Sequence, residues 1–199
     1  PLVMARGGGA MNSFPYYHER GVNIGLGTDT FPPDMILNMH VGTMVTRIRT
    51  GGPTVSAADY YTAATIDGAN AIGRPDLGRL AAGAKADITV FDLSAFHMGQ
   101  VVDPIQTMVL NGSGRDFTTV IVNGRTVIRD RQVDGYDLRA MHAQAQQQYE
   151  NLMASYPERS PLHPPVDVAR HHVGAAEVLR RLEPQHRRDG ARVGVEQVL

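Results

Sequence analysis

The chain has 199 residues, 42% of them apolar, and its 19 basic and 20 acidic side chains give a formal net charge of -1. This length suits one ordinary domain or two small ones, and the apolar fraction supports a hydrophobic core. The balanced charge argues against a nucleic-acid surface or a polybasic membrane patch. The absence of cysteine excludes disulfide scaffolds, thiolate zinc sites and cysteine nucleophiles, and favours the cytoplasm.

No stretch of the sequence approaches the roughly 18 apolar residues that span a bilayer. The N-terminus lacks the charged segment and long apolar run of a signal peptide. The chain begins on Pro1, directly ahead of a short apolar run. A start of this kind suggests a fragment or a processed product.

The first fifty residues alternate between short apolar runs and helical patterns. Residues 2–5 predict a buried strand, and residues 13–20 predict a helix that Gly21 ends. The run 22–27 is too short for a helix and lacks clean alternation, which favours a parallel strand covered on both faces. Two prolines stop it, and a helix is expected over 34–49. This order is typical of an α/β layer or barrel.

The next segment predicts one long helix over residues 56–72. Ser56 and Asp59 have the capping-box spacing, and Gly73 occupies the position that follows a helix end.

The following region predicts a small antiparallel β unit. A strand is expected over 86–92, and two further runs, 118–122 and 125–129, flank the pair Asn123-Gly124. This pair is preferred in two-residue type I′ hairpins.

The last confident pattern is a helix capped by Asp137, with apolar residues at spacings of three and four from Leu138 to Tyr156. Beyond Pro157 the chain is rich in proline and arginine. One more amphipathic helix is expected near residues 168–182, and the end is expected to be mobile.

Three segments together resemble the amidohydrolase superfamily, in particular its cytosine deaminase and triazine hydrolase branch. Residues 21–30 (GVNIGLGTDT) are similar to the last barrel strand and its terminal aspartate. Residues 77–92 (LGRLAAGAKADITVFD) resemble the entry to the family's small β-sandwich domain, and 116–125 (DFTTVIVNGR) resemble its closing hairpin. The resemblance extends over residues 1–156.

The resemblance implies an α/β fold built from the C-terminal part of a TIM (β/α)8 barrel and part of a small β-sandwich. Residues 1–73 would form the last two strand–helix units, 74–135 the sandwich segment, and 136–199 a C-terminal helix with a mobile extension. A full barrel takes about 250 residues, so most of it would lie outside this chain.

Asp29 is the candidate catalytic residue and metal ligand. By position alone, an aspartate between a strand and a helix is usually a cap or turn residue. In the family, the corresponding aspartate binds one divalent ion, zinc or iron, and exchanges a proton with the metal-bound water that attacks the substrate. An unpaired carboxylate at the end of a buried strand would also be costly without a cation. Thr30 and Phe31 follow as substrate-binding candidates.

The remaining metal ligands of the family are absent from this sequence. They include a His-x-His pair, and none of the eight histidines forms such a pair. Because a catalytic zinc site needs three protein ligands plus water, the isolated chain is expected to be inactive. The intact protein would act on a small-molecule substrate and form a homo-oligomer, a dimer or higher.

Other features have plainer interpretations. Gly25-Leu26-Gly27 lacks the third glycine of a dinucleotide-binding loop. The glycine-rich loop 6–9 is best interpreted as flexible, although the family's corresponding loop faces the substrate. Asp59 is interpreted as a cap, and Asp87 and Asp92 as residues that make turn contacts or surface pairs.

Three hypotheses follow. The chain is part of a hydrolase of non-peptide carbon–nitrogen bonds that deaminates or dehalogenates a nitrogen heterocycle. Alternatively, it is an inactive remnant that serves as a binding or assembly module. A third hypothesis is a cyclic-amide hydrolase similar to imidazolonepropionase or dihydroorotase.

Overall fold

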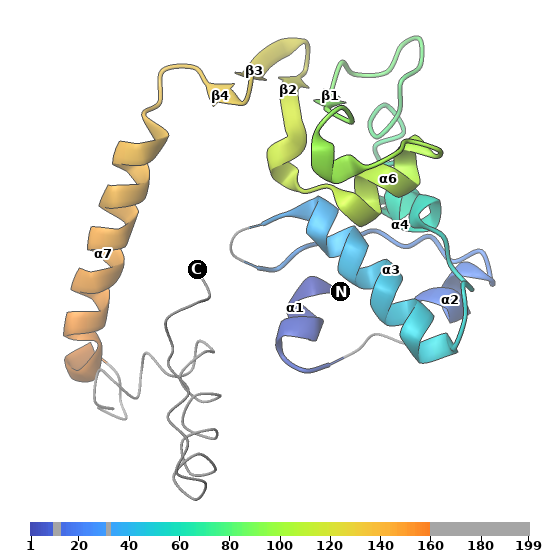
Figure 1. Cartoon of the computed structure of the whole chain (residues 1–199), viewed down its shortest axis with the longest axis horizontal. Helices are drawn as coiled ribbons and strands as arrows, with labels where there is room; N and C mark the ends of the chain where they lie inside the picture. The colour runs from blue at the N-terminus through green and yellow to red at the C-terminus, as the bar shows by residue number, and fades with distance from the viewer. Residues whose placement is uncertain (10–12, 31–32, 160–199) are drawn as a thin grey trace, which may run out of the picture. The chain divides into compact units, whose positions relative to one another are not determined.

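The computed structural model of the chain describes residues 1–9, 13–30 and 33–159. The chain divides into two compact units, the first Pro1–Gly135 and the second beginning at Tyr136. In the first unit, helices lie around the long helix α3 and the strands lie together beyond them (Figure 1). The predicted mixed α/β class is confirmed, whereas the predicted boundary at residue 73 stays a prediction.

The helices are α1 (Leu2–Arg6), α2 (Ser13–His18), α3 (Met35–Thr50), α4 (Ala57–Ala64), α5 (Ile66–Ala71), α6 (Pro104–Asn111) and α7 (Leu138–Arg159). The strands are β1 (Ile88–Phe91), β2 (Phe117–Val122), β3 (Arg125–Arg129) and β4 (Gln132–Val133), and two short 3-10 helices are η1 (Phe96–Met98) and η2 (Gly114–Asp116). Within the described ranges, no helix is both long and apolar enough to cross a membrane.

The four strands form one antiparallel sheet in the order β1-β2-β3-β4. Asn123 and Gly124 both have positive φ angles, 49° and 79°, as a type I′ turn requires. The Asp87 carboxylate accepts a hydrogen bond from the Asn123 backbone N–H at 2.6 Å. The predicted strand, hairpin and turn contact are therefore confirmed.

The core of the first unit lies where α2, α3 and α4 meet. The rings of Phe14 and Tyr60 stack with centroids 4.1 Å apart, and both side chains are buried. Gly42 on α3 faces this pair, and a Cβ there would overlap the Tyr60 ring. The Tyr60 hydroxyl lies 2.7 Å from Thr46 Oγ1. Burial raises the pKa of Tyr60, and this hydrogen bond opposes the rise only in part.

The helix predicted over 34–49 is confirmed as α3, with the Asp34 side chain accepting from Leu37 N at its start. The capping box of Ser56 and Asp59 is confirmed at the start of α4. The single helix predicted over 56–72 is wrong, because the chain breaks at Thr65 into α4 and α5.

Gly78, thirteen residues further along the chain, packs closely against the break at Thr65: a Cβ at Gly78 would lie 2.5 Å from the Thr65 carbonyl oxygen. The Thr65 hydroxyl donates to the Tyr61 carbonyl, four residues back, at 2.8 Å, a bond that often bends helices.

The strand predicted over 2–5 is wrong, because these residues form helix α1. A strand needs a neighbouring strand for its backbone groups, whereas a helical turn satisfies them locally. The Ala5 N–H donates to the Pro1 carbonyl at 2.9 Å, and of the helix residues only Leu2 is buried.

The predicted strand over 22–27 is extended but is not part of a sheet. Its backbone is joined to α4 through Leu26 N and the Ala63 carbonyl, 3.2 Å apart. Ile24 and Leu26 are half-buried against the core, whereas Asn23, Gly25 and Gly27 are exposed. No strand of the described chain pairs with this segment, so its burial on both faces in a parallel sheet stays a prediction.

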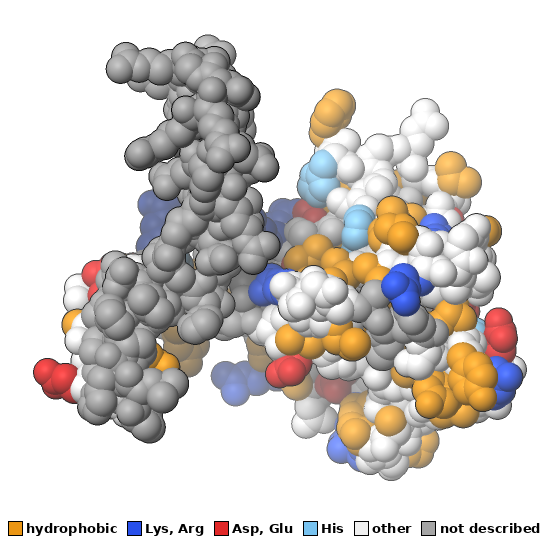
Figure 2. Space-filling view, turned by 90° about the horizontal axis from the view of Figure 1, so that it is seen from below, with side chains coloured by type: hydrophobic (Ala, Val, Ile, Leu, Met, Phe, Trp, Pro, Cys, Tyr) orange, Lys and Arg blue, Asp and Glu red, His pale blue; other side chains and the backbone are white. Residues whose placement is uncertain are grey.

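Hydrophobic side chains also lie exposed on the first unit, and Figure 2 shows patches of them on the face viewed there. Val3, Met4, Tyr16, Tyr17 and Val22 are among them. They belong to α1, α2 and the start of the extended segment.

Of the helices that follow β1, one was missed and the other was predicted from the sequence. Helix α6 was missed because it is short, although Asp103 and Pro104 give a clear helix start. The helix capped by Asp137 is confirmed as α7, with Asp137 Oδ1 accepting from Ala140 N at 3.0 Å. The tail helix predicted near 168–182 lies outside the described residues.

Candidate functional site

Asp29 lies in the loop between the extended segment and α3. Its side chain is exposed in the described chain, where the segment before it is extended but unpaired, so its position at the end of a buried strand stays a prediction. Its φ angle is +46°, in the left-handed region that residues other than glycine adopt rarely, aspartate more readily than most. The other described non-glycine residues with positive φ, Asn123, Asp130 and Arg131, occupy turns of the sheet.

The two substrate-binding candidates follow Asp29 directly. Thr30 is half-buried at the end of the described segment, and Phe31 lies outside the described residues. Thr30 is next to Asp29 in the chain, and Phe31 is the residue after it.

The loop is held before Asp29 by a residue that sequence reasoning missed. Asn38 on α3 is fully buried, and its Nδ2 donates to the Gly27 carbonyl at 3.1 Å. Its Oδ1 accepts from the Leu2 backbone N–H at 2.8 Å. The sequence did contain one indication of a buried polar contact: an asparagine among the apolar positions of the predicted helix.

The loop is held after Asp29 by Asp34. One carboxylate oxygen caps α3 through Leu37 N at 3.1 Å, and the other accepts from Gly114 N at 3.0 Å. Asp34 thus ties the start of α3 to η2, which precedes β2. Asn38 on α3 therefore holds the start of the loop, and Asp34 joins its end to α3 and η2.

The described residues do not by themselves make a metal site. No group of three or more histidine, cysteine, aspartate or glutamate side chains comes together in the described part of the chain. Asp29 offers one carboxylate, whereas a catalytic zinc site takes three protein ligands.

Two histidine–aspartate pairs occur away from this loop. His18 Nε2 lies 3.6 Å from Asp59 Oδ1, and the His18 ring stacks on Phe14. His97 Nε2 lies 3.2 Å from Asp116 Oδ1, and Asp116 is buried. Burial favours the protonated form of Asp116, but hydrogen bonds from Ser113 and from His97 outweigh it and lower its pKa.

The second pair serves a structural purpose rather than a catalytic one. Ser113 donates to Asp116 through both its backbone N–H (2.8 Å) and its hydroxyl (3.1 Å), which closes the turn η2. Because the hydroxyl is bonded to the aspartate and not to His97, the three residues do not form a nucleophilic triad.

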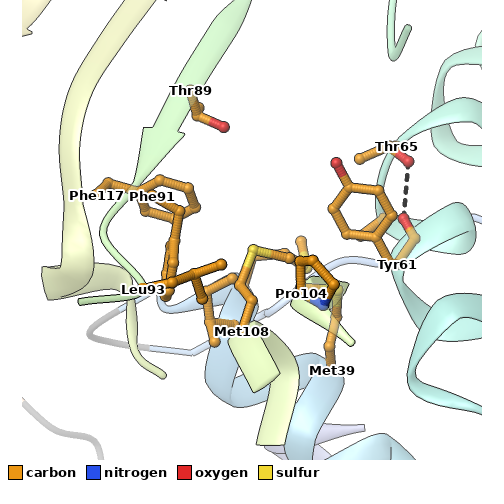
Figure 3. Close-up of a pocket in the computed structure, with 12 residues that line it drawn as sticks. Met39, Tyr61, Thr65, Thr89, Phe91, Leu93, Pro104, Met108 and Phe117 are labelled. Atoms are coloured by element: carbon orange, nitrogen blue, oxygen red, sulfur yellow. Dashed lines mark hydrogen bonds between the residues drawn. The ribbon is translucent and has the colours of Figure 1, made fainter. Parts of the chain in front are cut away.

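A cavity of about 370 Å³ lies between the helices and the sheet. Figure 3 shows the side chains of Met39, Met108, Phe91 and Phe117 pointing into it. Its polar groups include the hydroxyls of Thr65, Thr89 and Tyr61, and neither a carboxylate nor a histidine lines it. It does not include Asp29 and has no group suited to hydrolysis.

Residues 7–127 match the amidohydrolase family. The chain belongs to this family. The matched range includes Asp29, both of its anchors and the two downstream segments whose resemblance to the amidohydrolases was found in the sequence. That resemblance is confirmed.

Curated relatives in the amidohydrolase family are deaminases. The chain is 32% identical over 152 residues to 5'-deoxyadenosine deaminase of Methanosarcina mazei, covering 73% of this chain and 35% of that protein. It is 33% identical over 135 residues to 5-methylthioadenosine/S-adenosylhomocysteine deaminase of Nitratidesulfovibrio vulgaris, covering 65% and 31%. The chain thus spans about a third of the length of these relatives.

Solved structures share the fold. A zinc-bound adenosine deaminase from Xanthomonas campestris superimposes with a TM-score of 0.66 at 24% identity, over 70% of this chain and 33% of that one. An atrazine chlorohydrolase variant from Arthrobacter aurescens, complexed with zinc and atraton, gives 0.65 at 24% identity, over 73% and 34%. At this identity the likeness concerns the fold alone.

Proposed function

We propose that this chain forms the last part of a metal-dependent amidohydrolase that hydrolyses non-peptide carbon–nitrogen bonds and deaminates a nitrogen heterocycle. The observation that carries the proposal is the family match over residues 7–127, within which the relatives named above are deaminases. Those relatives exceed 30% identity, whereas the chlorohydrolase is 24% identical. Deamination is therefore favoured over dehalogenation.

In this proposal Asp29 supplies one carboxylate to a divalent ion, and the other ligands come from outside the chain. Zinc is favoured over iron because the two solved structures named above contain zinc. The left-handed backbone at Asp29 supports a functional role, since such conformations persist where the surroundings impose them and cluster at active sites. Thr30 and Phe31 are proposed to contact the substrate.

The finer fold belongs to the same proposal. The extended segment 22–28 would be a strand near the closing edge of a TIM barrel, and β1–β4 would be part of a small β-sandwich. The segment is covered on one face only; its own Val22 is exposed, and so is Tyr17 on α2 before it. Further barrel strands would cover both, and Asp29 would then lie at the strand end where barrel enzymes place their catalytic residues.

The alternatives are less well supported. A cyclic-amide hydrolase would share the fold, but the relatives described above are named deaminases. An inactive binding module is not favoured by any contact in the described chain. The substrate is proposed to be a small molecule, the complete protein a cytoplasmic homo-oligomer.

The test compares residues 1–199 with the same chain extended upstream along its reading frame to the length of the relatives. We expect the extended protein to release ammonia from 5'-deoxyadenosine or 5-methylthioadenosine, and residues 1–199 to release none. Asp29→Asn should reduce the rate by more than about 100-fold, because even changes outside the ligand shell cost 10–100-fold.

Asp130→Asn is the matched control, since Asp130 is also exposed and has a φ angle of +49°. It should leave the rate unchanged. Equal rates for Asp29→Asn and the unmodified protein would refute the proposed role of Asp29.

A further inference from the structure

We propose that Asn38 is the positioning residue for Asp29. It is a buried amide on α3 that fixes the backbone two residues before the carboxylate and keeps the Asp29 loop in one conformation. The inference rests on the proposed function of Asp29, but its structural part is testable without any activity.

The side chain of Asn38 joins three segments that are distant in the sequence. Its Oδ1 accepts from Leu2 N at 2.8 Å, and its Nδ2 donates to the Gly27 carbonyl at 3.1 Å. Asn38 is 0% exposed, so water does not replace either partner. A buried hydrogen-bonding group that loses its partner is costly, and both bonds are therefore retained in the folded state.

The chemistry of an amide suits this position better than the chemistry of its near-isosteres. One partner is a donor, the Leu2 N–H, and the other is an acceptor, the Gly27 carbonyl. An amide presents one acceptor and one donor in opposite directions, whereas a carboxylate offers acceptors only and leucine offers neither. The two partners also fix which end of the amide is the oxygen.

The Asp29 loop needs such an anchor because no sheet pairing holds the described segment that leads to it. Asp29 is exposed, and the segment before it lies outside the sheet. Its φ angle of +46° is uncommon for a residue with a side chain. Asp34 holds the far end of the loop through Leu37 N and Gly114 N, so Asn38 supplies the near end.

The first test uses the unmodified chain of residues 1–199 and nuclear magnetic resonance. The two side-chain amide protons of Asn38 should exchange with solvent at least about 100-fold more slowly than those of the exposed Asn70, because an exchanging proton must first break a buried bond. Equal exchange rates would overturn the proposal.

The second test uses two substitutions of Asn38 in the same chain. Asn38→Ala should shift the backbone carbon resonances of residues 27–30 toward coil values and expose the Leu2 amide to exchange. Asn38→Asp retains an acceptor, so it should shift residues 27–30 while the Leu2 amide stays protected. Unshifted resonances of residues 27–30 in a folded variant would overturn the proposal; if both variants unfold, the exchange result on the unmodified chain decides.

Thr43→Val is the matched control for the substitutions. Thr43 lies on the same helix and is equally buried, and its hydroxyl donates to the Met39 carbonyl of that helix. It should leave the resonances of residues 27–30 in place. An equal shift with Thr43→Val would show a general loosening of α3 and would overturn the specific role of Asn38.

Kinetic measurements on the upstream-extended protein distinguish a failure of this inference from a failure of the proposed function. Asn38→Asp should lower kcat by about 10–100-fold with metal content and KM little changed, as for residues that orient a metal ligand. A normal kcat there, with shifted resonances, would overturn the positioning role. If Asp29→Asn has no effect either, the proposed function fails, while the two magnetic resonance tests still decide whether Asn38 anchors the loop.

Discussion

The β unit and the extended segment before α3 are stabilised in different ways. In the sheet, backbone pairs such as Ile88 with Ile121 form the contacts, and a two-residue turn joins β2 to β3. The segment 22–28 is held by side chains and a helix carbonyl from elsewhere, chiefly Asn38 and Ala63. The first region has its backbone pairing within itself, whereas the second depends on its neighbours.

This difference matches the roles proposed for the two regions. The paired sheet contains no proposed site residue. The dependent segment contains Asp29, and proteins commonly place functional residues on loops that a rigid scaffold positions.

The largest effect is expected from the core contact that supports the extended segment. Phe14→Ala removes a buried ring that stacks on Tyr60, and should lower the free energy of unfolding by about 3–5 kcal/mol. Phe96→Ala is the matched control, because the Phe96 side chain is fully exposed, and should change it by less than about 0.5 kcal/mol. Urea denaturation measures both, and similar losses would contradict the assignment of the core.

A pair of glycine substitutions contrasts the two regions directly. Gly124→Ala should destabilise the chain by about 1–2 kcal/mol, because its φ angle of 79° is left-handed. Gly27→Ala should be neutral or stabilise by up to about 1 kcal/mol, since Gly27 is not left-handed and has open space around it. The same denaturation experiment checks the signs, and destabilisation by Gly27→Ala would mean that the segment is more tightly packed than described.

The same contrast explains what the sequence could predict. The Asn123-Gly124 turn and the Ser56 capping box are encoded within four residues, so local chemistry was enough to predict them. At the helix break, Thr65 is in close contact with the distant Gly78. Asn38 hydrogen-bonds to Leu2 and Gly27, which also lie far from it in the chain. Such distant partners leave no periodic signal in the sequence.

The extended segment shows why a correct family assignment can accompany a local structure that differs from the predicted one. Its apolar run is typical of a buried strand, but a strand also needs neighbours. Within the described chain, Leu26 bonds to α4 instead, and Asp29 is exposed rather than buried. The identity of Asp29 as a candidate was available from the sequence, whereas its environment was not.

The smallest effect is expected from acid titration of the sheet. Hydrogen bonds from the Ser94 hydroxyl and backbone, and from Arg131, lower the pKa of Asp92 from 3.8 to about 2. Because the folded pKa is the lower one, Asp92 stabilises the fold above pH 3.8, and this stability is lost as pH falls toward 2. Thermal unfolding at pH 5 and pH 2 should differ less in Asp92→Asn than in the unmodified chain. An unchanged difference would show that the Asp92–Arg131 pair does not stabilise the sheet.

The central claim is that Asp29 is a metal ligand of a larger hydrolase. The most direct measurement is the zinc content per chain, by elemental analysis after desalting, of the upstream-extended protein with and without Asp29→Asn. We expect about one zinc per chain in the unmodified protein and a tenfold or larger loss with the substitution, because the site loses one of its few protein ligands. Equal zinc content in the two proteins, or tightly bound stoichiometric zinc in residues 1–199 alone, would contradict the account.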